Sequence, residues 1–260
     1  MHVKKTGFIG LGLIGGSIAK AIRQYHPDCE ILAFDKNKET LALAVQEGII
    51  HTSCSSIDDN FRDCDYIFLC APVSCNTAYL SQVKNVLGPD CILPHVGSVK
   101  NSIHEKVISL GLEEHFIGGH PMTGSEKSGF VNAKPHLIEN AYYILTPSAK
   151  VSEEQVQSYR AFVESLKALP IILDYQQHDY VTGAISHLPH ILAASLVNFV
   201  KEHDTREELM KMLAAGGFKD ITRIASSSPV MWQQICLKNR GNISQILGEF
   251  IQTLTDAKQA

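Results

Sequence analysis

One histidine in this sequence stands where an imidazole could do acid–base chemistry. His120 follows Gly118 and Gly119, precedes Pro121, and comes shortly after the apolar pair Phe116-Ile117. We expect a strand over residues 115–117 and, after it, a loop that holds the imidazole against a ligand. A neutral imidazole, whose ordinary pKa is about 6.5, can accept a proton from a hydroxyl group. The alternative for His120 is a purely structural histidine.

A second group of residues could bind a dinucleotide. Gly10, Gly12 and Gly15 have the spacing Gly-x-Gly-x-x-Gly, directly after an expected strand and at the start of an expected helix. There Gly10 would allow a tight turn, Gly12 a close approach of the pyrophosphate, and Gly15 packing of helix on sheet. A glycine turn without a nucleotide is the alternative. The same turn includes the backbone of Leu13 and Ile14.

The cofactor type depends on Asp35, which follows Gly15 by twenty residues at the end of the expected strand 30–34. A carboxylate there can accept hydrogen bonds from the adenosine ribose, and it would repel a 2′-phosphate. The positive charges of Lys36 and Lys38, close to Asp35, would instead favour a 2′-phosphate. The sequence therefore favours NAD over NADP.

Two further segments follow expected strands, at the sheet edge where open α/β proteins bind ligands. Ala71, Pro72 and Val73 come after the strand 66–70, and we assign them to the cofactor site. Ser98, in the segment 97–100, comes after the strand 91–94. Its hydroxyl could cap the next helix, or it could bond a substrate and the catalytic histidine.

Composition limits the functional classes. A chain of 260 residues with a net charge of −4 and 45% hydrophobic residues is typical of a soluble globular protein and gives no basic surface for nucleic acid or a membrane. The apolar segment 6–10 is interrupted by glycines too early for a signal-peptide core or a spanning helix. The seven cysteines include no Cys-x-x-Cys pair, so we expect reduced thiols and a cytoplasmic protein.

The order of elements predicts an α/β fold, with a Rossmann-type dinucleotide-binding domain over residues 1–173 followed by an all-α domain over residues 174–260. The alternation of apolar runs and amphipathic stretches in the first part predicts a parallel sheet covered by helices. The helices of the second part are apolar on more than one face, which favours a homodimer. Expected strands cover residues 5–9, 30–34, 66–70, 91–94, 115–117, 141–145 and 170–173. Expected helices cover residues 13–25, 38–46, 74–87, 100–110 and 152–166, the last with a capping box from Ser152 to Gln155.

The helical part contains its own candidates. Ser186 and His190 are four residues apart and would share a helix face, whereas His187 would point elsewhere. No third ligand stands at a recognisable spacing, so we expect no metal. Arg223 lies among apolar residues, and its partner is either a bound anion or an internal carboxylate such as Asp220.

These motifs, in this order, resemble the prephenate/arogenate dehydrogenases of tyrosine biosynthesis. The resemblance spans nearly the whole chain, and the histidine loop and the Arg223 segment are its specific parts. It is carried by residues 10–17, 97–100, 118–122, 186–190, 217–220 and 222–225.

The resemblance implies an NAD-dependent oxidative decarboxylation of prephenate, with arogenate as the alternative substrate. His120 would deprotonate the ring hydroxyl with support from Ser98, and Arg223 would bind a substrate carboxylate. The rest of the substrate pocket would be formed by His190, Ser186, Ser125 and Trp232, the last reached across the dimer.

One position departs from the family pattern. His95 stands three residues before Ser98, where the family usually has an aspartate, and this puts the hydrogen bonding around Ser98 in question. Another hydroxyacid dehydrogenase is a second possibility, and His120 argues against it. A catalytically silent NAD-sensing protein is a third, but it would have no need of both His120 and Arg223.

Overall fold

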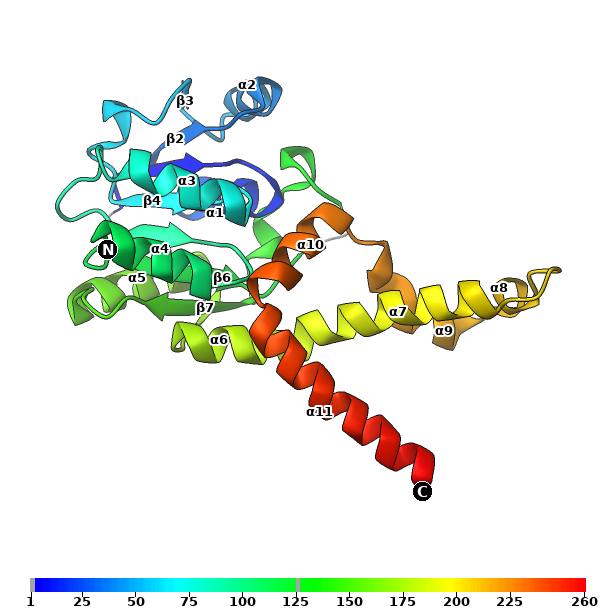
Figure 1. Cartoon of the computed structure of the whole chain (residues 1–260). Coiled ribbons are helices and arrows are strands. Elements are labelled where there is room, and N and C mark those ends of the chain that lie inside the picture. The colour runs from blue at the N-terminus through cyan, green and yellow to red at the C-terminus, as the bar shows by residue number, and fades with distance from the viewer. Residues whose placement is uncertain (1–2, 125–126) are drawn as a thin grey trace. The chain divides into compact units, whose positions relative to one another are not determined.

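The structure is a computed structural model that describes residues 3–124 and 127–260. These residues form two compact units, one ending at His178 and the other running from Asp179 to Ala260. The first unit is built on one sheet of eight strands in the order β3-β2-β1-β4-β5-β6-β7-β8. Figure 1 shows the strands side by side with helices around them. The strands are β1 Lys5–Ile9, β2 Glu30–Phe34, β3 Thr52–Cys54, β4 Tyr66–Leu69, β5 Leu93–His95, β6 Phe116–Pro121, β7 Tyr142–Pro147 and β8 Leu169–Ile172.

Helices cover both faces of this sheet, which explains why nearly all residues of its central strands are buried. Phe8 packs in one core with side chains of α1 and α5, whereas its neighbour Ile9 packs in a second core with α3 and α4. The alternation of side chains along a strand thus supplies both cores. The helices of this unit are α1 Leu13–Tyr25, α2 Lys38–Gln46, α3 Val73–Val83, α4 Asn101–Leu110 and α5 Glu153–Ser165, with short 3₁₀ turns at Asp59–Phe61, Phe130–Asn132 and Pro135–Leu137.

Local signals set several helix boundaries. The side chain of Asn37 accepts hydrogen bonds from the backbone N–H groups of Glu39 and Thr40 and so starts α2. The capping box predicted from Ser152 to Gln155 is confirmed at the start of α5. The α/β class with a Rossmann-type first part is likewise confirmed by the sheet order and its covering helices.

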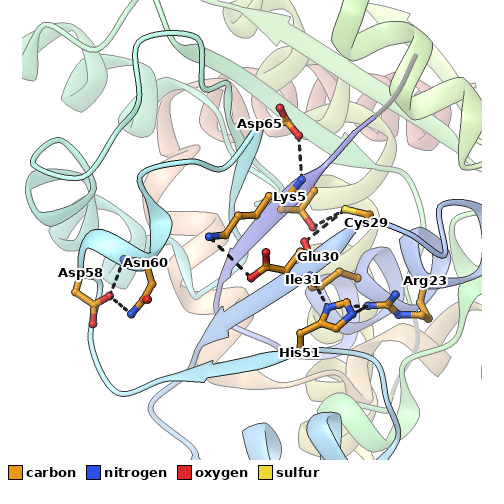
Figure 2. Close-up of polar contacts among 10 residues, drawn as sticks. Lys5, Arg23, Cys29, Glu30, Ile31, His51, Asp58, Asn60 and Asp65 are labelled. Carbon is orange, nitrogen blue, oxygen red and sulfur yellow. Dashed lines mark hydrogen bonds and ion pairs between the residues drawn. The ribbon is translucent and has the colours of Figure 1, made fainter.

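Polar contacts hold the outer part of the sheet together, and Figure 2 shows them. The backbone N–H of Ile31 donates to Nδ1 of His51 at 2.9 Å, and Arg23 reaches the same ring. Asp65 accepts from the N–H groups of Lys4 and Lys5 at 2.7 and 3.0 Å. The contacts of Asp65 fix the N-terminal end of β1, which leads into the glycine turn.

The sheet differs from the sequence-based expectation in three ways. β3 is an additional short strand, polar and mostly exposed, which gives no hydrophobic signal. β7 runs antiparallel to β6, so the sheet is mixed. This pairing extends β6 to Pro121 and places His120 opposite Ile144, so our prediction of His120 on a loop after residue 117 was wrong.

The second unit is helical. α6 Tyr175–Thr182 contains the boundary between the two units and continues into a π-helical segment, Gly183–His187, which a periodicity of 3.6 residues does not predict. The remaining helices are α7 Leu188–His203, α8 Leu209–Leu213, α9 Gly216–Thr222, α10 Pro229–Lys238 and α11 Arg240–Gln259, with a 3₁₀ turn at Arg223–Ser226.

Apolar side chains remain exposed on these helices, among them Phe199, Met212, Leu213, Ile251 and Leu254. By length and composition alone, the helical stretch Tyr175–His203 could cross a membrane. In a soluble protein, a large patch of exposed apolar side chains is usually covered by another protein surface.

Candidate functional site

The glycine turn after β1 leaves space for a ligand at the N-terminus of α1. Gly10 has a φ of +91°, and a Cβ there would lie 2.6 Å from the backbone nitrogen of Ala71, so this turn requires glycine. A Cβ on Gly12 would meet no atom within 4 Å. Gly12 is the N-cap of α1 and provides no side-chain cap, so the first N–H groups of the helix are available to an anion.

Asp35 is held rigidly beside this turn. Its Oδ2 accepts from the backbone N–H of Leu11 at 2.7 Å, and its Oδ1 accepts from that of Asn37 at 2.8 Å. Each carboxylate oxygen keeps further acceptor capacity for a hydroxyl group. The carboxylate lines a pocket together with Gly10, Gly12, Phe34, Lys36, Cys70, Ala71, Pro72, Cys75 and Tyr79.

Several of the predicted cofactor-binding residues line this pocket, and the others lie on the neighbouring helices. Gly10, Gly12, Asp35, Ala71 and Pro72 line the one pocket. A Cβ on Gly15 would lie 2.6 Å from the carbonyl oxygen of Gly10, so this residue serves the packing of α1. Leu13 and Ile14 form the first turn of α1, and Val73 begins α3.

His120 lies near the end of β6 with its imidazole half-buried. The glycines before it allow β7 and α4 to come close, because a Cβ on Gly118 would lie 2.2 Å from Oγ1 of Thr146. Nδ1 of His120 is 2.8 Å from Nε2 of His178, a fully buried residue of α6. Sequence reasoning missed His178, since a single histidine in an amphipathic helix gives no signal of its partner.

Lys100 links the two candidate catalytic residues. Its ammonium group donates to the carbonyl oxygens of Gly119 at 2.7 Å, of His95 at 3.2 Å, and of Gly97. Gly97 precedes Ser98 and Gly119 precedes His120, so one buried cation fixes the backbone next to both. From its place in the sequence, Lys100 was expected only to begin the helix 100–110.

Ser98 lies half-buried in the turn between β5 and α4. The alternative role as a helix cap is not realised, because Lys100 occupies the cap position of α4 without a side-chain cap. The hydroxyl group makes no hydrogen bond within the described part of the chain. It therefore keeps its donor and acceptor capacity for a ligand.

His95 is a neutral partner for Lys100. Its Nδ1 is 3.5 Å from the lysine nitrogen, and the whole side chain is buried. Burial, followed by the nearby charges of Lys100, His104 and His178, lowers the pKa of His95 well below its ordinary value. A neutral imidazole thus stands where the resembled family usually has an aspartate.

The candidates of the second unit form a stacked pair. The rings of His190 and Trp232 are parallel, with centroids 3.6 Å apart, and His187 meets the same indole edge-on at 6.0 Å. Trp232 thus contacts His190 of its own chain, and its role in a pocket reached across a dimer stays a prediction. One expectation is corrected, because His187 contacts the same indole as His190, and the π-helical segment alters the spacing from which the two histidines were placed on different faces. Burial lowers the pKa of His190, which favours the neutral ring.

The remaining candidates lie as follows. Arg223 begins a 3₁₀ turn and is exposed, and Ser186 is half-buried in the π-helical segment. Ser125 lies outside the described residues. No group of three or more His, Cys, Asp or Glu suited to a metal ion occurs within residues 3–124 and 127–260.

Comparison with known families and relatives gives a consistent result. Residues 18–172 match the family described as prephenate dehydrogenase, nucleotide-binding domain, and residues 174–260 match prephenate dehydrogenase, dimerization domain. The prephenate dehydrogenase of Bacillus subtilis is 38% identical over 247 residues, which are 94% of this chain and 67% of that protein. This chain thus spans about two thirds of the length of that relative.

Two solved structures are similar over nearly the whole chain. The prephenate dehydrogenase of A. aeolicus, in complex with hydroxyphenyl propionate and NAD⁺, superposes with a TM-score of 0.93 at 32% identity, covering 100% of this chain and 91% of that one. The arogenate dehydrogenase of Synechocystis superposes with a TM-score of 0.86 at 28% identity, covering 97% and 90%.

The contacts of Lys100 predict a stability effect. Replacing Lys100 with Met removes the donor for the buried carbonyl oxygens and should lower the free energy of unfolding by about 2–3 kcal/mol. Thermal or urea unfolding measures this change. Lys84→Met is the matched control, because Lys84 also donates to a carbonyl oxygen, that of Leu110, but at the surface. Equal effects of the two substitutions would contradict the role assigned to Lys100.

Proposed function

Because this chain belongs to the prephenate dehydrogenase family, we propose that it catalyses the NAD-dependent oxidative decarboxylation of prephenate to 4-hydroxyphenylpyruvate. The observation that carries this proposal is the pairing of a dinucleotide turn with a histidine that lies near the end of a strand of the same sheet. In that reaction NAD⁺, when bound, accepts a hydride from the ring carbon that bears the hydroxyl group.

The residues of the first unit fit NAD. The open N-terminus of α1 and the space above Gly12 suit a pyrophosphate, which binds well at helix N-termini. The fixed carboxylate of Asp35 suits the two hydroxyl groups of the adenosine ribose. Ala71, Pro72 and Val73, with the first turn of α1 at Leu13 and Ile14 and with Ser98, would complete the binding site.

His120 would act as the general base. Its imidazole takes the proton of the ring hydroxyl as the hydride leaves, and Ser98 orients the same hydroxyl. The carbon–carbon bond to the ring carboxylate breaks and carbon dioxide leaves. The released electron pair completes the aromatic ring, and the ring oxygen takes the proton back from His120 to become the phenol hydroxyl of the product. Loss of carbon dioxide makes the reaction irreversible.

Residues of the second unit would bind the dianionic substrate. We assign a substrate carboxylate to Arg223, whose exposed guanidinium can form charge-assisted hydrogen bonds. The stacked pair of His190 and Trp232, with Ser186, would line the side-chain end of the pocket. Ser125 is assigned to the same pocket from the sequence alone.

The assembly and cellular location are also proposals. We propose a homodimer, because the second unit exposes many apolar side chains and matches a dimerization domain. The apolar stretch Tyr175–His203 would then be covered by a second copy, and not by lipid. We place the boundary between the domains after residue 173, and the protein in the cytoplasm like a soluble biosynthetic enzyme, with no nucleic-acid or membrane partner.

A steady-state assay tests the function. NADH formation is followed with purified protein, NAD and either prephenate or arogenate, and we expect the higher kcat/KM with prephenate. A higher kcat/KM with arogenate would support arogenate dehydrogenase, which the Synechocystis structure keeps as the second candidate. No turnover of either compound, with NAD binding retained, would instead support an NAD-sensing protein.

Cofactor choice gives a separate prediction. Asp35→Ser removes the carboxylate that is assigned to the ribose, so kcat/KM for NAD should fall about 10- to 100-fold, the range for charge-assisted hydrogen bonds. The value for NADP should change much less, because the repulsion of its 2′-phosphate is removed as well. Asp28→Ser, at an exposed aspartate before the other end of β2, is the control. A wild-type protein that uses NADP as well as NAD would contradict the assignment.

A further inference from the structure

The imidazole of His120 is bonded to a second imidazole inside the first unit. Its Nδ1 lies 2.8 Å from Nε2 of His178, and the two ring planes are inclined by 59°. His178 is fully buried on α6, whereas His120 is half-buried. Since Nδ1 of His120 is used in this contact, Nε2 is the nitrogen through which His120 can meet a substrate hydroxyl.

A hydrogen bond between two ring nitrogens holds one proton, so the pair has two possible arrangements. In the first, His120 donates through Nδ1–H, and its Nε2 is an unprotonated base. In the second, His178 donates through Nε2–H, and a neutral His120 then carries its proton on Nε2 and cannot accept another. The bond to His178 therefore decides whether His120 is a base.

We propose that His178 is a positioning residue that holds His120 in the tautomer with the proton on Nδ1. The proposal rests on the function proposed above, in which His120 accepts the proton of the ring hydroxyl. Once His120 is protonated, its Nδ1–H still donates to the neutral His178, so the same hydrogen bond stabilises the product of the proton transfer. This is the relation of a base to the group that orients it in other acid–base sites.

His178 lies in a buried region that also contains the ammonium group of Lys100. Burial disfavours the charged form of an imidazole, and the buried ammonium group of Lys100 adds a positive charge to the same region, where it also acts on His95. Within the part of the chain that the structure describes, the charged and titratable groups that act in this region include Lys100, His95 and His104, and Asp174 and Asp179 lie close to His178 in the sequence.

The arrangement also predicts a pH effect. A proton added to His178 at low pH would make both of its nitrogens donors, and the bond to His120 would reverse. Activity should then fall as pH decreases, with an apparent pKa that belongs to the pair and not to either ring. A side chain at position 178 that accepts a hydrogen bond but does not titrate should leave a profile set by His120 alone.

Two substitutions separate positioning from packing. His178→Leu has no acceptor and should lower kcat about 10- to 100-fold, less than loss of the base itself, with the KM for prephenate and the Kd for NAD nearly unchanged. His178→Gln places a carbonyl oxygen near the position of Nε2 and should restore kcat to within about threefold of the wild type. His115→Leu is the matched control, because Nδ1 of His115 bonds the carbonyl oxygen of Cys91 before the other end of β6, away from His120.

The tautomer itself can be measured without turnover. Long-range ¹H–¹⁵N NMR of the full-length protein with ¹⁵N-labelled histidine distinguishes Nδ1–H from Nε2–H, and the signal of His120 is identified by its loss in His120→Asn. We expect Nδ1–H in the wild type and in His178→Gln, and Nε2–H in His178→Leu.

The outcomes are distinct. Nε2–H on His120 in the wild type overturns the proposal even if His178→Leu fails to fold. An unchanged kcat in His178→Leu overturns it too, as does a His178→Gln variant that loses as much activity as His178→Leu while its Tm falls. If the wild type oxidises neither prephenate nor arogenate, the proposed function fails, and the NMR result still decides the tautomer.

Discussion

The buried ammonium group of Lys100 must be met by oxygen atoms, because an unpaired charge inside a protein costs several kcal/mol. It takes carbonyl oxygens from the turn that follows β5 and from β6. Those carbonyls belong to the residues just before Ser98 and His120, so the need to satisfy one cation fixes the backbone at both candidate catalytic positions. The two glycines before His120 keep this arrangement free of steric clashes, since side chains there would push β7 and α4 away.

The order of the strands places Ser98 and His120 at the same edge of the sheet as the candidate cofactor site. β1, β4, β5 and β6 are parallel neighbours, so their carboxyl ends lie at one edge of the sheet. The glycine turn follows β1, Ala71 follows β4, Ser98 follows β5, and His120 lies near the end of β6. Open α/β sheets bind ligands at this edge because the loops there converge on the N-termini of the following helices. Hydride transfer from a substrate beside His120 therefore fits the order of the strands.

Much of this was readable in the sequence where local signals are strong. The bounds of β1, α1, β2 and α2 were predicted correctly, because glycine turns, an asparagine cap and apolar runs all lie within a few residues. Features that depend on residues far apart in the sequence could not be predicted from it. The antiparallel pairing with β7 places His120 inside a strand, and the contact between His120 and His178 joins residues 58 positions apart. The π-helical segment before α7 breaks the periodicity on which helix faces are assigned.

The most direct test of the account is the rate of hydride transfer in His120→Asn, followed as NADH absorbance in a single turnover with enzyme in excess over prephenate. Asparagine keeps a polar side chain but cannot accept a proton near neutral pH. If His120 is the base, the rate should fall by about two to four orders of magnitude, with the Kd for NAD unchanged. A rate within about threefold of the wild type would remove His120 from the chemistry and contradict the account.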